Sequence, residues 1–421
     1  MHSVKKISIL GCRGIPGNHG GFETFAERLS RYLVQQGWEV TVYCEDYKGR
    51  EISEEYWNGI RLIQIPVPKA SASATILFDW KSTLHAAREG NLILTLGYNT
   101  ALFCGLYRMK GLTNIINMDG LEWRRQKWSA PEKAWLYINE RFGCWFGNHL
   151  VADHPEIANH LATRVSRRKI TMIPYGAERV GKADEALIKP YGLTPNNYSI
   201  IIARPEPENN ILEIVSAFSS KRRNAKLVVL GNYRPGKNDY HKQVLAAASD
   251  EVVFPGGIYD LSTVGALRYY ATLYLHGHSV GGTNPSLVEA MGAGASVLAH
   301  SNHFNRWVAG PGAHYFSNEL ECAQAFDELL NDADELRRMK QASLKRFKEG
   351  FSAEIECRTY EDLLERALDG RLSNPPLDPA KGESAQTRAS RPAYEATSVS
   401  SRKRFAQPSP SQPSQIGTLP D

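Results

Sequence analysis

Short apolar runs alternate with amphipathic stretches along the first half of the chain. The runs KISIL, WEVTVYC, IRLIQIP, LILTLG, TNIINMD, HLVAD and ITMIPYG are typical of buried strands, and stretches such as FETFAERLSRYLVQQG between them have helical spacing. Near residue 198 the pattern begins again with YSIIIA, KLVVLG, VVFPG, TLYLHG and SVLAH. Strands that alternate with helices form parallel sheets covered on both faces. Two successive rounds therefore predict an α/β protein with two Rossmann-like domains.

A polar segment separates the two rounds. It lies between Gly176 and Pro195 and contains further glycine and proline residues, which are typical of a linker. We therefore predict a first domain over residues 1–185 and a second domain over residues 186–350. From residue 370 to the end, proline, serine, glutamine and basic residues replace the apolar runs, and this composition predicts a disordered tail.

Composition narrows the class of protein. Hydrophobic residues make up 42% of the 421 residues, enough for sizeable cores, so the chain as a whole is not disordered. The 50 Lys and Arg residues exceed the 45 Asp and Glu residues by a net charge of +5, which is too mild to indicate a nucleic-acid partner. Six cysteines without a C-x-x-C pair are typical of free thiols in a reducing cytosol.

The sequence predicts neither a signal peptide nor a membrane span. The first strand stops at Gly11, which is too early for the apolar region of a signal peptide. The best candidate span, NLILTLGYNTALFCGLYRM, is interrupted by Gly97, Asn99 and Thr100, which predict a strand followed by a helix. We therefore expect a cytoplasmic protein.

The first loop, GCRGIPGNHGGFETF, has the outline of a nucleotide-binding turn. Its strand ends near Leu10 and its helix begins near Phe22, so eleven residues intervene where the dinucleotide fold has a tight turn. Gly20 and Gly21 precede the helix and leave backbone N–H groups where an anion or a hydroxyl could bind. The alternative is that the glycines of this loop only permit unusual backbone angles. They include three at G-x-x-G-x-x-G spacing, which is not the dinucleotide fingerprint: Gly11, Gly14 and Gly17.

A second glycine-rich loop, in HGHSVGGTNPSLVEAM, precedes another helix. Asn284 is a good N-cap, and Pro285 takes the first helical position. Backbone N–H groups of three residues just before this helix can hold a diphosphate: Gly281, Gly282 and Thr283. Glu289, one turn into the helix, can only accept hydrogen bonds when ionised, so its partners would be sugar hydroxyls. Arg204, directly after a strand, is suited to a diphosphate. The alternatives are a surface ion pair for Arg204 and a capped surface helix for Glu289.

These motifs resemble a known family. HSVGGTNPSLVEAMGAG and ARPEPENN resemble the donor half of retaining glycosyltransferases of family 4, which have the GT-B fold. GCRGIPGNHGGFETFAERL, together with NMDGLEWRRQKW, is similar more narrowly to the bacterial rhamnosyltransferase-like branch. The resemblance covers roughly residues 4–366. It implies two Rossmann-like domains that face each other across a cleft, with the nucleotide sugar on the second domain and the acceptor on the first. It also implies that a final helix, residues 351–369, crosses back to the first domain.

The resemblance assigns roles to individual residues. Glu289 would bind the ribose of the nucleotide, and Arg204 its diphosphate. Gly20 and Gly21 would belong to a loop that closes on the donor. Asp119 would lie near the reacting sugar, and we give it a positioning role in catalysis rather than that of a nucleophile. The alternative is that Asp119 only caps the following turn.

The chain also departs from the family pattern. The first glutamate of the family motif falls at Gly281, and the lysine that partners the arginine falls at Asn209. Relative to the narrower branch, Cys12 replaces a threonine and His19 a tyrosine. We interpret nucleotide binding as retained and keep Asn209, Gly281, Gly282 and Thr283 among the donor-binding residues. His276 and His278, close to this loop, are expected to be packed histidines rather than catalytic ones.

The acceptor side is predicted around the basic and aromatic residues 123–128 and Glu122, which precedes them. Four of its residues are candidates for contact with a lipid pyrophosphate acceptor at an anionic membrane: Glu122, Trp123, Arg124 and Arg125. Sugar stacking on Trp123 is the alternative. Ser129 and Glu132 form the pattern of a capping box that opens the next helix. One face of that helix carries apolar residues that we expect in the core: Trp135, Ile138, Phe142 and Trp145.

The sequence thus predicts a glycosyltransferase of the hexosyltransferase class. It would move a sugar, most simply rhamnose from dTDP-rhamnose, with retention, to a lipid-linked oligosaccharide in cell-surface polysaccharide synthesis. No metal and no cofactor are expected, and the enzyme would lie at the inner face of the plasma membrane. A GT-B nucleotide-sugar epimerase, an NAD-dependent oxidoreductase and a non-catalytic sugar-binding scaffold are the rivals. Glu45 and Asp46, after the second strand, support the oxidoreductase, whereas the long first loop argues against it.

Overall fold

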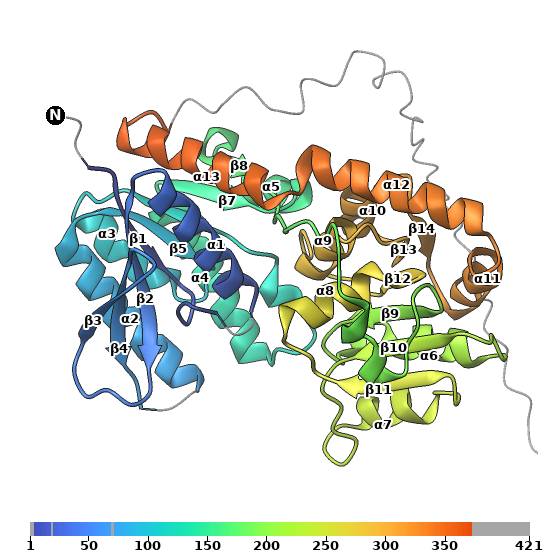
Figure 1. Cartoon of the computed structure of the whole chain (residues 1–421). Coiled ribbons are helices and arrows are strands. Elements are labelled where there is room, and N and C mark those ends of the chain that lie inside the picture. The colour runs from blue at the N-terminus through green and yellow to red at the C-terminus, as the bar shows by residue number, and fades with distance from the viewer. Residues whose placement is uncertain (1–3, 18–19, 69–70, 373–421) are drawn as a thin grey trace, which may run out of the picture. The chain divides into compact units, whose positions relative to one another are not determined.

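The first sheet has eight strands in the order β3-β4-β2-β1-β5-β6-β7-β8 (Figure 1). The computed structural model describes residues 4–17, 20–68 and 71–372, so His19 and the predicted tail from residue 373 onward lie outside the described residues. All pairings in this sheet are parallel except β3 with β4. The strands are β1 (Lys6–Leu10), β2 (Glu39–Asp46), β3 (Ser53–Trp57), β4 (Ile60–Pro66), β5 (Leu92–Leu96), β6 (Asn114–Asn117), β7 (His149–Ala152) and β8 (Ile170–Met172).

The second sheet has six strands, all parallel, in the order β11-β10-β9-β12-β13-β14. They are β9 (Tyr198–Ile202), β10 (Lys226–Leu230), β11 (Val252–Gly256), β12 (Leu273–His276), β13 (Val297–His300) and β14 (His314–Phe316). The two sheets confirm the predicted α/β class, and they belong to one compact unit of the chain. The predicted domain boundaries at residues 185 and 350 stay predictions.

Helices cover both sheets because each presents an apolar face to the strands. The helices of the first sheet are α1 (Gly21–Gln35), α2 (Ala72–Glu89), α3 (Gly105–Met109), α4 (Ala130–Phe146) and α5 (Pro155–Ala162). Those of the second are α6 (Ile211–Ser219), α7 (Asp239–Ala246), α8 (Leu261–Tyr269), α9 (Pro285–Gly292), α10 (His303–Ala309), α11 (Glu319–Leu329) and α12 (Ala333–Gly350). Each sheet is bounded by two separate clusters of buried apolar side chains, one on each face.

The last helix, α13 (Ala353–Leu368), follows α12 in the chain but packs on the first sheet, beside α1 (Figure 1). Tyr360 lies against Phe25 of α1, with ring centroids 4.8 Å apart. A buried ion pair joins Arg28 of α1 to Glu356 of α13. Because both charges leave water, each depends on the other for compensation. Helix α13 therefore ties the C-terminal end of the described chain to its first sheet.

One strand of the first sheet was missed, one local expectation was wrong and one is confirmed. Strand β3 was not predicted, because its sequence SEEYW is mostly polar and exposed and its only partner is β4. The apolar stripe on α4 is not in the core: Ile138 is 48% exposed and Trp145 57%. The helix buries the neighbouring face instead, including Leu136 and Cys144. The capping box at its start is present as predicted. Among the described residues, no helix is long and apolar enough to cross a bilayer.

Candidate functional site

Loops at the carboxyl edges of the two sheets meet each other. A Cβ atom placed on Gly120, after β6, would lie 3.8 Å from the backbone of Gly281, after β12. Thr283, in the same loop as Gly281, donates its backbone N–H to the carboxylate of Asp153 after β7, at 2.9 Å. Ligands of open α/β sheets bind at this edge. The structure thus brings together residues that the sequence placed on separate domains.

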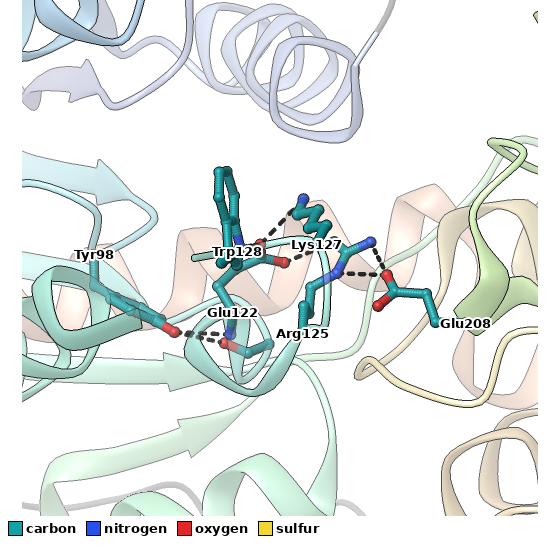
Figure 2. Close-up of polar contacts among 7 residues, drawn as sticks. Tyr98, Glu122, Arg125, Lys127, Trp128 and Glu208 are labelled. Carbon is teal, nitrogen blue, oxygen red and sulfur yellow. Dashed lines mark hydrogen bonds and ion pairs between the residues drawn. The ribbon is translucent and has the colours of Figure 1, made fainter. Parts of the chain in front are cut away.

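Asp119 follows β6 in a left-handed backbone conformation, with a φ of 50°. Its N–H donates to the side-chain oxygen of Asn117 at 2.9 Å. The next turn is fixed by the buried hydroxyl of Tyr98, which accepts from the N–H of Glu122 and donates to the carbonyl of Gly120 (Figure 2). Burial, together with the negative charge of Glu122, raises the pKa of Asp119 to about 6. The backbone of Asp119 is therefore held in place at the carboxyl edge of the first sheet.

Glu122 and Arg125, predicted on the acceptor side, form a network that reaches the second sheet (Figure 2). The Glu122 carboxylate accepts from Arg125 at 2.8 Å and from the Trp128 ring at 3.2 Å, and Lys127 lies 3.5 Å away. Burial opposes the charge of Glu122, but Arg125 outweighs it, and the pKa of Glu122 is lowered. Arg125 also donates through Nε to Glu208, at 2.8 Å. These side chains bridge the two halves of the molecule.

Trp123 and Arg124 differ in their surroundings. The Trp123 ring is partly buried, and its Nε1 donates to the buried carboxylate of Glu140 at 2.6 Å. The ring also packs edge-on against Tyr137 of α4, with centroids 5.3 Å apart. Arg124 is exposed, and its guanidinium group lies 5.0 Å from the Trp123 ring. The indole N–H of Trp123 is thus engaged in structure, whereas Arg124 faces solvent.

Arg204, after β9, lies in a group of positive charges. It is exposed, and its charge helps to lower the pKa of Lys127, which burial depresses most. Burial, together with the charges of Arg125 and Arg204, also lowers the pKa of His278 to about 3. His278 stacks on the buried His276 at 4.4 Å, as expected for packed histidines. Arg125 and Lys127 have the carboxylates of Glu122 and Glu208 as partners, so Arg204 is the cation of this group best placed to bind an anion.

Asn209 holds the backbone of Arg204 through a hydrogen bond. It lies at the end of the short helix η6 (Pro207–Asn209) and is buried. Its side-chain amide donates to the carbonyl of Arg204 at 2.8 Å. Among the described residues, its side-chain oxygen has no hydrogen-bond partner. Asn209 therefore fixes the backbone of Arg204 and adds no charge of its own.

The loop before α9 contacts a buried carboxyl group that the sequence analysis missed, from Asp153. Asn284 caps the helix by accepting the N–H of Ser286, as predicted. The carboxylate of Asp153 lies so close to Gly282 that a Cβ there would come within 2.3 Å of it. Burial, together with the charge of Asp119, raises the pKa of Asp153 to about 8. The N–H of Thr283, predicted to bind the diphosphate, is thus occupied by Asp153.

Glu289 on α9 has a side chain that is 33% exposed. One of its oxygens lies 2.5 Å from the guanidinium group of Arg268, which is itself buried on α8. Arg268 also donates to Ser286, at 3.3 Å. The pair fixes the direction of the Glu289 carboxylate. Arg268 could not be identified from the sequence, because its partner Glu289 lies on a different helix.

Gly20 and Gly21 place the end of the first loop beside the start of α9. Gly20 caps α1 with a φ of 122°, and a Cβ there would lie 1.9 Å from the Glu23 carboxylate, so the position requires glycine. A Cβ on Gly21 would come 3.8 Å from the ring of Pro285. The N-terminal ends of α1 and α9 therefore face each other, with the first loop beside the second.

Two protein-family models match the chain. Residues 4–178 match a domain of unknown function, DUF1972, and residues 184–346 match glycosyl transferases group 1. The second match spans the predicted donor-binding residues from Arg204 to Glu289. No curated protein sequence matches the chain.

Solved glycosyltransferase structures share the fold at low sequence identity. Sucrose-phosphate synthase from Thermosynechococcus elongatus is 16% identical, with a TM-score of 0.72 over 87% of this chain and 100% of that chain. HepE from Anabaena, in complex with UDP, is 13% identical, with a TM-score of 0.65 over 86% of this chain and 100% of that chain. An α,α-trehalose-phosphate synthase from Burkholderia xenovorans, in complex with glucose-6-phosphate, is 11% identical, with a TM-score of 0.65 over 86% and 100% of the two chains.

Proposed function

We propose that this chain, a glycosyltransferase with the GT-B fold and a group 1 domain over residues 184–346, transfers a sugar from a nucleotide sugar to a lipid-linked saccharide. The donor that we propose is dTDP-rhamnose, and the product is an intermediate of cell-surface polysaccharide synthesis. The resemblance of GCRGIPGNHGGFETFAERL and NMDGLEWRRQKW to the rhamnosyltransferase-like branch of family 4 supports this choice. HepE, which shares the fold, was solved in complex with UDP, and this supports a nucleotide donor.

The single observation that carries the proposal is the meeting of cations and helix N-terminus at one edge. The cations are Arg204, exposed after β9, and Lys127 and Arg125, which lie around Glu122. The loop before α9 adds the positive end of a helix, although Asp153 occupies the N–H of Thr283. A diphosphate carries the charge that both features attract. Glu289, held by Arg268, is placed to accept a hydrogen bond from a hydroxyl of the nucleotide's ribose or deoxyribose.

The proposed reaction breaks the bond between the sugar's anomeric carbon and the diphosphate, and forms a bond from that carbon to an acceptor oxygen. Arg204 and Lys127 stabilise the negative charge that develops on the leaving diphosphate, as electrostatic catalysis requires. The acceptor hydroxyl passes its proton to a diphosphate oxygen on the same face, so the configuration is retained. Asp119, with a pKa of about 6, is mostly ionised at neutral pH and accepts a hydrogen bond from a hydroxyl of the transferred sugar. Its role is to position that sugar.

The acceptor end of the proposal rests on the first domain. Arg124 is exposed and remains the member of residues 122–125 best placed to contact an anionic lipid. Glu122 and Arg125, which bridge the two sheets, hold the segment in place. We propose a position at the inner face of the plasma membrane for the whole enzyme.

Calorimetric titration of nucleotide sugars tests the donor site. We expect Arg204→Ala and Glu289→Ala each to weaken the binding of dTDP-rhamnose about tenfold or more, because a hydrogen bond to a charged group contributes about 1.5–3 kcal/mol. Arg222→Ala is the matched control, since Arg222 is an exposed arginine at the opposite edge of the same sheet. Donor affinity equal to wild type in both site variants would remove this assignment.

A further inference from the structure

Asp153, which follows β7, brings a carboxyl group from the first sheet to the loop before α9. Its side-chain oxygen Oδ2 accepts the N–H of Thr283 at 2.9 Å, and the hydroxyl of Thr283 donates to the backbone carbonyl of Asp153. A Cβ atom on Gly282 would come within 2.3 Å of Oδ1 and 2.4 Å of Oδ2, so any other residue there would displace the carboxyl group. Two hydrogen bonds and a glycine therefore fix Asp153 against this loop.

Only one of the two side-chain oxygens of Asp153 is satisfied within the described part of the chain. The second oxygen, Oδ1, is buried and forms no hydrogen bond with any described residue. A buried polar atom without a partner destabilises a fold, so such atoms usually bind water or a ligand. The Oδ1 atom of Asp153 is therefore available to a ligand that enters beside the loop.

The loop leaves room for such a ligand beside Gly281. This residue has a φ of 139°, and a Cβ atom on it would meet no heavy atom within 4 Å. Two other glycines border the loop closely. A Cβ atom on Gly120 would lie 3.8 Å from the backbone of Gly281, and one on Gly21 would lie 3.8 Å from the ring of Pro285. The open space at Gly281 is thus next to the ends of β6 and α1.

The charge of Asp153 suits a hydroxyl group beside a diphosphate. Burial, together with the charge of Asp119, raises the pKa of Asp153 to about 8, so the group is mostly protonated at neutral pH. A protonated carboxyl group can donate a hydrogen bond as well as accept one. It also does not repel the diphosphate proposed to bind at Arg204, as a carboxylate would. A sugar hydroxyl, which itself donates and accepts, matches this group.

We propose that Asp153 is a specificity-determining residue, whose Oδ1 atom forms a hydrogen bond with a hydroxyl of the transferred sugar while Oδ2 keeps its bond to Thr283. This inference rests on the proposed glycosyl transfer and adds to it a residue that recognises the sugar. The proposed function places the diphosphate at Arg204 and the start of α9, and the sugar at Asp119. Asp153 contacts the loop that joins these two places, because Gly120 follows Asp119 and borders the same loop.

Calorimetric titration with and without the sugar tests this contact. Solutions of dTDP-rhamnose and of dTDP are titrated into the full chain, and the two dissociation constants are compared as a ratio. We expect Asp153→Ala to shift this ratio against dTDP-rhamnose about tenfold or more, because only the sugar loses a hydrogen bond. A purely structural role of Asp153 would change both affinities by the same factor and leave the ratio as it is.

Asp153→Asn is the conservative variant. Its side-chain oxygen can accept the N–H of Thr283 and its amide can bond a hydroxyl, so we expect a ratio within about threefold of wild type. Asp79→Ala is the matched control. Burial raises the pKa of this carboxyl group on α2 to about 7, and Asp79 accepts a hydrogen bond from Thr100 at 2.8 Å. Its removal should leave the ratio unchanged, because Thr100 belongs to the first half of the chain.

An unchanged ratio in Asp153→Ala, or an equal shift in Asp79→Ala, would overturn the sugar contact and leave the proposed function intact. The wild-type titrations test the proposed function separately, with dTDP-glucose, UDP-glucose and GDP-mannose added to the series. A nucleotide sugar that binds in place of dTDP-rhamnose is compared with its own diphosphate in the same variants. Failure of the wild type to bind any of the four would overturn the proposed function, and this inference with it.

Discussion

Trp123 was expected to contact a membrane or a sugar, but its indole N–H makes a structural hydrogen bond instead. Its neighbours in the sequence are basic and aromatic, which favoured a membrane or sugar contact. In the fold its indole N–H donates to Glu140, a buried carboxylate that also accepts from His160 and Arg164. A pattern of residue types cannot reveal this network, because its members come from separate helices. Arg124, the next residue, remains exposed.

The Glu140 network makes a stability prediction. Trp123→Phe keeps most of the ring but removes one hydrogen bond to a buried charge, so we expect the free energy of unfolding to fall by about 1–3 kcal/mol in urea titrations. Trp128→Phe is the matched control, since Trp128 donates to Glu122 at 3.2 Å and Glu122 keeps two basic partners. Equal effects of the two substitutions would show that the bond to Glu140 has no special weight.

Helices and strands were predictable where one face is apolar and the other polar. Five of the six strands of the second sheet follow the pattern, and the three-residue strand β14 is the one that was not predicted. The cap of α9 and the capping box of α4 are also present as predicted. For helix α4 the wrong face was predicted to be buried, because two adjacent stripes of this helix both contain apolar residues. The stripe through Leu136 and Cys144 packs on the sheet and leaves the one with Ile138 in solvent. Periodicity alone cannot choose between two such faces.

The loop before α9 makes a pH-dependent prediction through Asp153. Its pKa in the folded state, about 8, lies above its usual value of 3.8, so the folded protein binds more protons than the unfolded chain between these values. Stability from this group is therefore complete below pH 4 and is lost as the pH rises to 8. We expect Asp153→Asn to lose less stability than wild type between pH 5 and about 8 in urea titrations.

Asp260→Asn is the control for this experiment. Asp260 is exposed and accepts hydrogen bonds from Thr263, which lower its pKa, so it stays ionised throughout the same pH range. Its removal should leave the slope of stability against pH unchanged. A wild-type slope in Asp153→Asn as well would contradict the buried position of the Asp153 carboxyl group.

At the scale of the whole molecule, contacts distant in sequence assemble the candidate site. Arg125 and Glu208 are 83 residues apart in the chain, and Asp153 and Thr283 are 130 apart. The sequence could assign Arg204 and Glu289 to strand and helix ends, since parallel strands place those ends at one edge. It could not show that Asp153 occupies the N–H of Thr283 or that Arg268 fixes Glu289, because nothing local to either residue requires those partners.

The central claim is transfer of a sugar from a nucleotide sugar to a lipid, and product analysis tests it most directly. The full chain is incubated with radiolabelled dTDP-rhamnose and lipid-linked saccharides. We predict equal amounts of released dTDP and of label in the lipid fraction, with loss of both in Glu289→Ala but not in Arg222→Ala. Conversion of the nucleotide sugar to an isomer, with no label in the lipid fraction, would contradict this account and indicate an epimerase.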